Sequence, residues 1–224
     1  MKTSVAIYTH ATRTASLERT LQSVRDANLR VDVVTTQARG ASNALNRTNA
    51  VAALSQAFNG NAVLMLEDDV LLSPYARAWI EHLETHVRDV TTLYAPVGKF
   101  YPTTVREFVD FRKPVPRHLH GVHPLERLRG WYGAQAVWIP APWVESILAT
   151  PDFRREERDP LGPWDHALRK HLLQHDAGMR VVVPNVVQHQ APPSVVNRSG
   201  PRHTTPIFDA AAKPPERNHH ASRS

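Results

Sequence analysis

Three consecutive carboxylates, Glu67, Asp68 and Asp69, interrupt an otherwise apolar segment, AVLMLEDDVLLS at residues 62–73. Like charges placed side by side repel one another, and burying them is costly unless a positive charge compensates them. Carboxylate oxygens suit a hard divalent cation, which would offset this repulsion. The alternative is that the carboxylates cap the helix that follows and face the solvent.

A histidine far along the chain is a candidate second ligand for such a cation. His189 lies in NVVQHQ (185–190), which follows the last predicted strand. A neutral imidazole is a frequent metal ligand, and a mixed set of carboxylate, imidazole and phosphate groups suits Mn²⁺ somewhat better than Mg²⁺. The chain has 13 histidines, however, and spacing alone does not single out this one.

A further carboxylate, Asp165 in GPWDHALRK, lies in the first turn of a predicted helix. The helix dipole favours the ionised form there, and an ionised carboxylate can accept a proton from a hydroxyl nucleophile. Acidic residues are also favoured in first turns for stability alone. The sequence by itself does not separate these two explanations.

The elements that position these residues alternate in type along the chain. Strands are predicted at 4–9, 30–36 and 61–66, each followed by a helix, at 14–27, 42–58 and 73–87. Strand–helix alternation is typical of a doubly wound parallel sheet, in which ligands bind beyond the carboxyl ends of the strands. The acidic triplet lies at one such end.

The second half of the chain is less regular. Residues 93–130 are rich in Pro, His, Arg and aromatic residues, and we expect an irregular excursion over the sheet. Four more elements are predicted after it: a strand at 130–140, helices at 141–148 and 162–174, and a strand at 180–184. We expect one domain over 1–197 and a basic, Pro/His/Ser-rich tail over 198–224 that is loosely ordered or strapped onto the rest.

Composition excludes some chemistries and favours certain partners. The chain has no cysteine among its 224 residues, which excludes disulfides, thiolate metal sites and cysteine nucleophiles. The net charge is +6, with 27 Lys+Arg against 21 Asp+Glu. This charge favours polyanionic partners, although an arginine-rich composition is also what a GC-rich genome encodes.

The N-terminus predicts no targeting segment. The apolar stretch within MKTSVAIYTHATR is too short for a signal peptide, and no apolar run approaches the roughly 20 residues that span a bilayer. We therefore expect a soluble protein in the cytoplasm of a bacterial or phage-infected cell. Peripheral contact with a membrane stays open.

Taken in order, these segments resemble the GT-A class of nucleotide-sugar glycosyltransferases. SVAIYTHATRTASLERTLQSV is similar to the opening strand and helix of that family, and RGASNALNRTNAVAAL to the stretch beside the nucleotide base. LEDDVLLSP resembles the D-x-D element in an E-D-D form, and GWYGAQAVWIPAPWVESIL the acceptor-side strand and helix. WDHAL matches the position of the catalytic acid/base, and VPNVVQHQAPPS the closing segment. The resemblance spans about residues 4–197.

The resemblance implies a fold and a set of roles. It implies an α/β, Rossmann-like fold with a mostly parallel central sheet flanked by helices, in a single domain with an irregular acceptor-side insertion. Asp69 would be the direct metal ligand and His189 the second, with Mn²⁺ or Mg²⁺ as the ion. Asp165 would deprotonate the acceptor if the enzyme inverts configuration. Candidate contacts to the nucleotide sugar are Glu67, Asp68, Thr9, Arg13, Asn43 and Arg47. Because Glu67 replaces the first aspartate of D-x-D, which of Glu67 and Asp68 contacts the ribose stays open.

The acceptor is the least determined part of this interpretation. Basic and aromatic residues interleave between 106 and 129 and suit a phosphate backbone with a stacked base. A hydroxymethylated base in bacteriophage DNA, turned out of the duplex, is one acceptor of this kind. Alternatives are a cell-envelope glycan or lipopolysaccharide built at an anionic membrane surface, a solvated lid, or a non-catalytic nucleic-acid-binding protein on a transferase fold. The candidate acceptor contacts are Arg112, Lys113, Arg117, Trp131, Tyr132 and Gly133.

Overall fold

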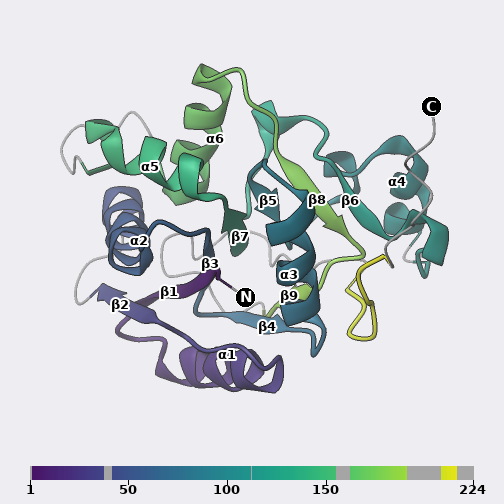
Figure 1. Cartoon of the computed structure of the whole chain (residues 1–224), viewed down its shortest axis with the longest axis horizontal. Coiled ribbons are helices and arrows are strands. Elements are labelled where there is room, and N and C mark those ends of the chain that lie inside the picture. Colours follow the sequence, from purple (N-terminus) through teal and green to yellow (C-terminus); the bar gives the residue numbers. More distant parts are fainter. Residues whose placement is uncertain (1, 38–41, 112, 155–161, 191–207, 216–224) are drawn as a thin grey trace.

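A computed structural model describes residues 2–37, 42–111, 113–154, 162–190 and 208–215. A seven-stranded sheet with the order β2-β1-β3-β7-β5-β8-β6 forms its centre (Figure 1). Its strands are β1 (Ser4–His10), β2 (Val33–Gln37), β3 (Val63–Glu67), β5 (Thr91–Thr92), β6 (Gly121–Pro124), β7 (Ala136–Ile139) and β8 (Arg180–Val183).

Helices flank this sheet and fill the connections between its strands. The α-helices are α1 (Thr14–Asp26), α2 (Asn43–Ala57), α3 (Ala76–His86), α4 (Thr103–Asp110), α5 (Ala141–Ala149) and α6 (Trp164–Gln174). Short 3₁₀ turns are η1 (Gly98–Phe100), η2 (Arg117–Leu119), η3 (Leu128–Gly130) and η4 (Pro151–Arg154). The start of α2 has a local cause: the Ser42 Oγ accepts a hydrogen bond from Leu45 N at 3.1 Å and caps the helix.

The predicted strand–helix alternation is confirmed for the first half of the sheet. β1 pairs in parallel with both β2 and β3. In the second half two strands run against the others, because β7 is antiparallel to β3 and β5, and β6 is antiparallel to β8. The sheet nevertheless remains mostly parallel, as expected, since all strands other than β6 and β7 run in one direction.

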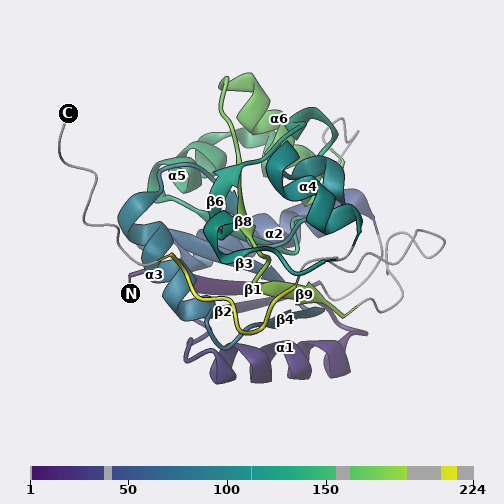
Figure 2. The ribbon, with the colours of Figure 1, turned by 90° about the vertical axis from the view of Figure 1, so that its right-hand side faces the viewer.

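The sheet carries an apolar core on each face because side chains alternate along its strands. Val5 and Ile7 of β1 face one core, which α1 and α3 cover. Ala6 and Tyr8 face the other, which α2, α5 and α6 cover. Figure 2 shows this layering, with α1 below the sheet and α5 and α6 above it.

A second, two-stranded sheet joins distant parts of the chain. β4 (Val70–Leu72), which follows the acidic triplet, pairs antiparallel with β9 (Val187–His189). The register places Val70 opposite His189, and Gln190 N donates to Asp69 O at 2.7 Å. The sequence pattern did not predict this pairing, yet it brings His189 to the acidic turn.

The remaining segments are more ordered than expected. The excursion at 93–130 contains α4 and the edge strand β6. Within the tail, residues 208–215 pack on α3: Trp79 Nε1 donates to Ala212 O at 3.1 Å, and Phe208 forms a bridge with Asn185. Residues 208–215 thus lie against the rest of the fold, while 198–207 and 216–224 lie outside the described residues. Among the helices described, not one combines the length and the apolar character needed to cross a bilayer.

Candidate functional site

The acidic triplet lies where β3 ends. Glu67 is the last residue of β3, and Asp68 and Asp69 form the tight turn into β4. The two aspartates are 3% and 2% exposed, respectively, so they do not simply face the solvent. Burial at this level requires compensating partners, as the sequence suggested.

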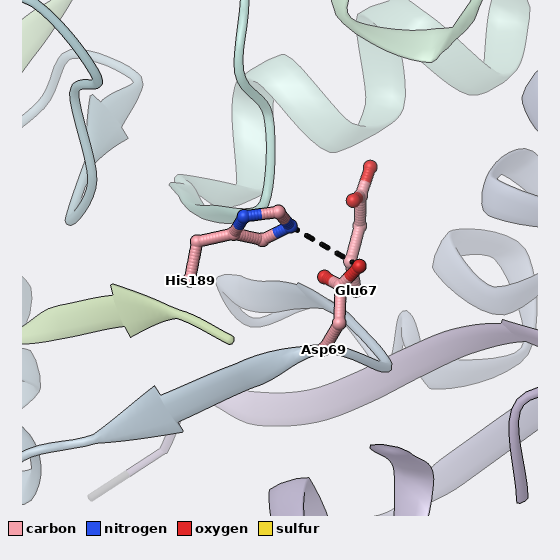
Figure 3. Close-up of side chains that lie close together, drawn as sticks. All are labelled: Glu67, Asp69 and His189. Carbon is pink, nitrogen blue, oxygen red and sulfur yellow. Dashed lines mark ion pairs between the residues drawn. The ribbon is translucent and has the colours of Figure 1, made fainter. Parts of the chain in front are cut away.

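Glu67, Asp69 and His189 converge on one point (Figure 3). One ligand atom from each residue lies within 4.8 Å of the others. His189 Nε2 is 3.1 Å from Asp69 Oδ2, and the β4–β9 pairing fixes this approach. Asp69 Oδ1 is buried and has no hydrogen-bond partner among the described residues.

Arg13, just before α1, supplies a positive charge to the same turn. Its Nη1 donates to Asp68 Oδ1 at 2.9 Å and also to Asp69 Oδ2. Its side chain is only 15% exposed, so this contact is poorly screened by water. Arg13 was expected to contact the nucleotide; the structure places it on the cavity wall while it pairs with these two aspartates.

The pKa values of two carboxyl groups in the turn are shifted in opposite directions. Burial, followed by the charge of Asp69, raises the pKa of Glu67 to about 8. Burial would also raise the pKa of Asp69, but its hydrogen bond with His189 and the charges of His189 and Arg13 hold that pKa below its ordinary value. Tyr8 Oη donates to Glu67 Oε1 at 2.7 Å, and burial together with Glu67 raises the pKa of Tyr8.

Asp68 fastens the end of β1 to the acidic turn. Its Oδ2 accepts hydrogen bonds from Thr9 Oγ1 and from His10 N, the latter at 3.2 Å. Together with Arg13, these partners occupy both oxygens of Asp68. Asp68 and Thr9 are therefore hydrogen-bonded to each other, and both also line a cavity.

A cavity of about 610 Å³ opens beside the triplet, within the roughly 300–1,000 Å³ typical of small-molecule sites. Glu67 lies on the wall of this cavity and is also a member of the Glu67/Asp69/His189 cluster. Asp69 and His189 are not among the described residues that line the cavity. Other parts of the wall come from the end of β1 (Tyr8, Thr9, His10), from α2 (Asn43, Asn46, Asn49) and from α6 (Asp165, His166).

Asp165 lies on the wall of this cavity in a fixed orientation. Gly133 N donates to its Oδ2 at 3.1 Å, and His166 N donates to its Oδ1 at 2.9 Å. The start of α6 is held in turn by α2, because Trp164 N donates to Asn46 Oδ1 at 3.2 Å. The carboxylate therefore faces the same cavity as the acidic turn, from another element.

Several predicted contacts lie elsewhere. Arg47 is 1% exposed and donates to Phe153 O at 3.3 Å and Gly162 O at 2.6 Å, so it braces the backbone outside the described cavity wall. Trp131 is fully buried in the core, whereas Lys113 and Arg117 are exposed. Tyr132 is half-buried, with Lys99 Nζ 5.6 Å from its ring centre. Arg112 falls outside the described residues.

Sequence reasoning missed other residues of the cavity. Tyr8 reads as one more apolar residue of a strand, and Gln135 and His166 carried no motif of their own. Asn46 and Asn49 had a usable signal: with Asn43 they recur every three residues, which places all three toward one side of a helix. The structure puts all three on the cavity wall.

The Glu67/Asp69/His189 cluster fits a divalent cation. It offers two carboxylates and an imidazole, a donor set that suits Mn²⁺ or Mg²⁺. Asp69 Oδ1, without a partner among the described residues, has the unused acceptor capacity that a cation would satisfy.

Comparisons with known proteins give information on the fold and not on the function of this chain. No family model matches the chain, and a search of curated proteins finds no match. The crystal structure of A197 from STIV is similar with a TM-score of 0.50 at 12% identity, over 97% of this chain and 100% of that one. A glycosyltransferase involved in the glycosylation of the major capsid of PBCV-1 gives a TM-score of 0.41 at 13% identity, over 89% of this chain and 96% of that one. The first likeness shows a shared fold, and the second is too weak to support a statement about this chain.

Proposed function

We propose that this protein is a glycosyltransferase that moves a sugar from a nucleotide-diphosphate donor to an acceptor hydroxyl with the help of a divalent cation. The observation that carries the proposal is the convergence of Glu67, Asp69 and His189 beside a ligand-sized cavity. On the wall of that cavity lies a second carboxylate, Asp165, that takes no part in the Glu67/Asp69/His189 cluster. A cation site and a separate base around one cavity are the two parts that such a transfer needs.

Asp69 and His189 would hold the cation, with Glu67 as a further oxygen ligand. The cation, Mn²⁺ in preference to Mg²⁺, supplies neutralisation of the charge that develops on the leaving nucleoside diphosphate. Arg13, which lies on the cavity wall and already pairs with Asp68 and Asp69, adds a fixed positive charge to the same end of the cavity. A diphosphate is thereby attracted to the triplet although the triplet is acidic.

Asp165 would act as the general base. The acceptor hydroxyl oxygen forms a bond to the anomeric carbon, the bond from that carbon to the phosphate oxygen breaks, and the hydroxyl proton passes to Asp165. Such a single displacement inverts the anomeric configuration. The two backbone N–H donors on Asp165, from Gly133 and His166, fix the direction in which the carboxylate points.

The acceptor that we propose is a hydroxymethylated base in DNA. Phe111 is 70% exposed and Lys113 Nζ lies 5.3 Å from its ring centre, which gives a cation and an aromatic face side by side on the surface. Arg117 is exposed in the same excursion. Pairs of this kind suit a phosphate backbone and an unstacked base.

The test is mass spectrometry of hydroxymethylated DNA incubated with the protein, MnCl₂ and a panel of nucleotide sugars. We expect a mass gain equal to one sugar with one of the donors, and none when EDTA replaces the metal. The Asp69→Asn variant is expected to lose at least about tenfold in Mn²⁺ affinity, the effect seen even for outer-shell partners, and to give no product. The exposed Asp26→Asn variant is the matched control.

The outcomes separate the parts of this proposal. If sugar is transferred to an envelope glycan and not to DNA, the proposed acceptor is wrong, but the assignment as a glycosyltransferase remains. If the Asp69→Asn and Asp26→Asn variants are equally active, and EDTA does not lower the activity, the proposed role of the cation is refuted. A thermal shift with DNA alone and none with nucleotides and Mn²⁺ would favour a non-catalytic nucleic-acid-binding protein.

A further inference from the structure

Gln135 lies on the wall of the cavity, and the proposed mechanism does not use its side chain. Its side chain lies on the cavity wall, yet its Oε1 is buried and accepts no hydrogen bond from any described residue. A buried carboxamide oxygen without a donor costs about 1–3 kcal/mol, so such groups usually serve a ligand or hold a water molecule. Because the rest of the Gln135 side chain lies on the wall of a ligand cavity, a ligand hydroxyl is a candidate donor for this oxygen.

Gly133 leaves space beside the Gln135 carboxamide. It has a φ of +101°, which glycine adopts readily, and a Cβ there would lie 2.9 Å from Gln135 Oε1 and 3.4 Å from Tyr94 Cε1. A larger residue at position 133 would therefore displace the carboxamide. Gln135 O accepts a hydrogen bond from Glu67 N at 2.8 Å, which ties the same residue to the acidic turn.

These contacts put Gln135 between the two ends of the proposed reaction. On one side it is bonded to Glu67, next to the proposed cation and hence to the donor phosphates. On the other side Gly133, two residues away, is bonded to Asp165, the proposed base. The transferred sugar must lie between the phosphates and the acceptor hydroxyl. A diphosphate has no proton to donate at neutral pH, whereas every free sugar hydroxyl has one.

We infer that Gln135 Oε1 accepts a hydrogen bond from a hydroxyl of the sugar carried by the donor, and so forms a sugar-binding subsite. This inference rests on the proposed function and adds the residue that recognises the sugar. The subsite favours donors that carry a hydroxylated hexose over the bare nucleoside diphosphate. Gln135 contributes to the binding of the sugar and leaves the binding of the nucleotide unchanged.

The test compares bare and sugar-bearing ligands. Calorimetric titrations with MnCl₂ would measure the affinities of the protein for UDP, GDP, CDP, ADP and dTDP and for a hexose conjugate of each. Gln135→Met keeps the chain length and removes the carboxamide, and the exposed Gln174→Met on α6 is the matched control. We expect Gln135→Met to lower the preference for the conjugate over its diphosphate by about three- to tenfold, the effect of one hydrogen bond, with the affinity for the diphosphate unchanged.

A Gln135→Met variant that keeps the preference of the unsubstituted protein would overturn the subsite, since a water molecule would then be the partner of Oε1. A loss of affinity for diphosphate and conjugate alike would also overturn it, because the residue would then shape the cavity as a whole. If the unsubstituted protein binds none of these ligands, the proposed function itself fails and the subsite with it. That result is distinct from the other two.

Discussion

At the scale of single residues, Arg13 decides how the acidic turn can be buried. Its guanidinium bonds to both Asp68 and Asp69, which are almost fully buried. Removing one partner of such a group leaves uncompensated charge, which costs about 3–5 kcal/mol when the pair is fully buried. Arg13 retains some exposure, so the lower end of that range applies.

We therefore expect Arg13→Met to lower the free energy of unfolding by about 3 kcal/mol in EDTA, measured by urea denaturation. MnCl₂ should restore part of this loss, because a bound cation again compensates the carboxylates and binds the folded state alone. Arg25→Met, at an exposed position of α1, is the control, with an expected change within about 0.5 kcal/mol. Equal stability of the two variants in EDTA would show that Arg13 is dispensable to the turn.

Residue type predicted part of this site and left out the rest for a physical reason. Clustered carboxylates in an apolar run are costly, so Glu67, Asp68 and Asp69 were conspicuous in the sequence. Tyr8 and Gln135 were not, because a polar atom inside a strand or loop leaves no periodic trace. Their surroundings appear only in the fold: the Tyr8 hydroxyl donates to Glu67, far along the chain, and the backbone conformation of Gly133 leaves space beside the Gln135 carboxamide.

At the scale of elements, the sequence pattern predicted the helices α1, α2, α3, α5 and α6 and the strands β1, β2, β3, β7 and β8, but not α4, β5, β6 or the β4–β9 pairing. β4 and β9 have three residues each, too few for a pattern, and more than a hundred residues separate them. The pairing is nevertheless what sets His189 beside Asp69. The sequence identified both candidate ligands, Asp69 and His189. It did not predict that they lie side by side, because this depends on backbone pairing between two short strands that have no recognisable sequence pattern.

A buried histidine, His171, lies where α6 contacts α5. His171 Nε2 lies 2.9 Å from Ser146 Oγ, and the rings of Phe153 and His175 lie 5.4 and 4.6 Å from the His171 ring, centre to centre. Burial, followed by the nearby His175, lowers the pKa of His171. The unfolded chain therefore binds a proton at this residue, near pH 6.5, before the folded chain does.

Stability linked to His171 should be complete above about pH 6.5 and fall as the pH drops below it, since protonation favours the unfolded chain. His171→Gln keeps a donor for Ser146 and cannot titrate. We expect its free energy of unfolding to fall less steeply than that of the unsubstituted protein between about pH 7 and about pH 5.5, measured by urea denaturation. Parallel pH curves for the two proteins would contradict this assignment.

At the scale of the whole molecule, the chain returns to α3 near its end. Ala212 is buried, Ala212 O accepts from Trp79 Nε1, and Lys213 Nζ lies 5.3 Å from the Tyr75 ring centre. Asp209 N donates to Asn185 O at 3.2 Å, just before β9. Composition predicted a tail either loosely ordered or strapped onto the rest, because polar residues and proline dominate it. At residues 208–215, a few apolar contacts and one buried indole donor hold the chain against the fold.

A chain ended after Ile207 loses this docked segment. We expect its free energy of unfolding to be lower by about 2 kcal/mol, because the buried Trp79 Nε1 loses its acceptor and apolar surface of α3 becomes exposed. A chain ended after Pro215 keeps every described contact of the segment and is the matched control. Urea denaturation of the two truncated chains checks the difference, and equal midpoints would show that the docking of 208–215 adds nothing to the stability of the fold. If the free energy of unfolding falls only in the shorter chain, residues 208–215 are the segment that covers the core around Trp79.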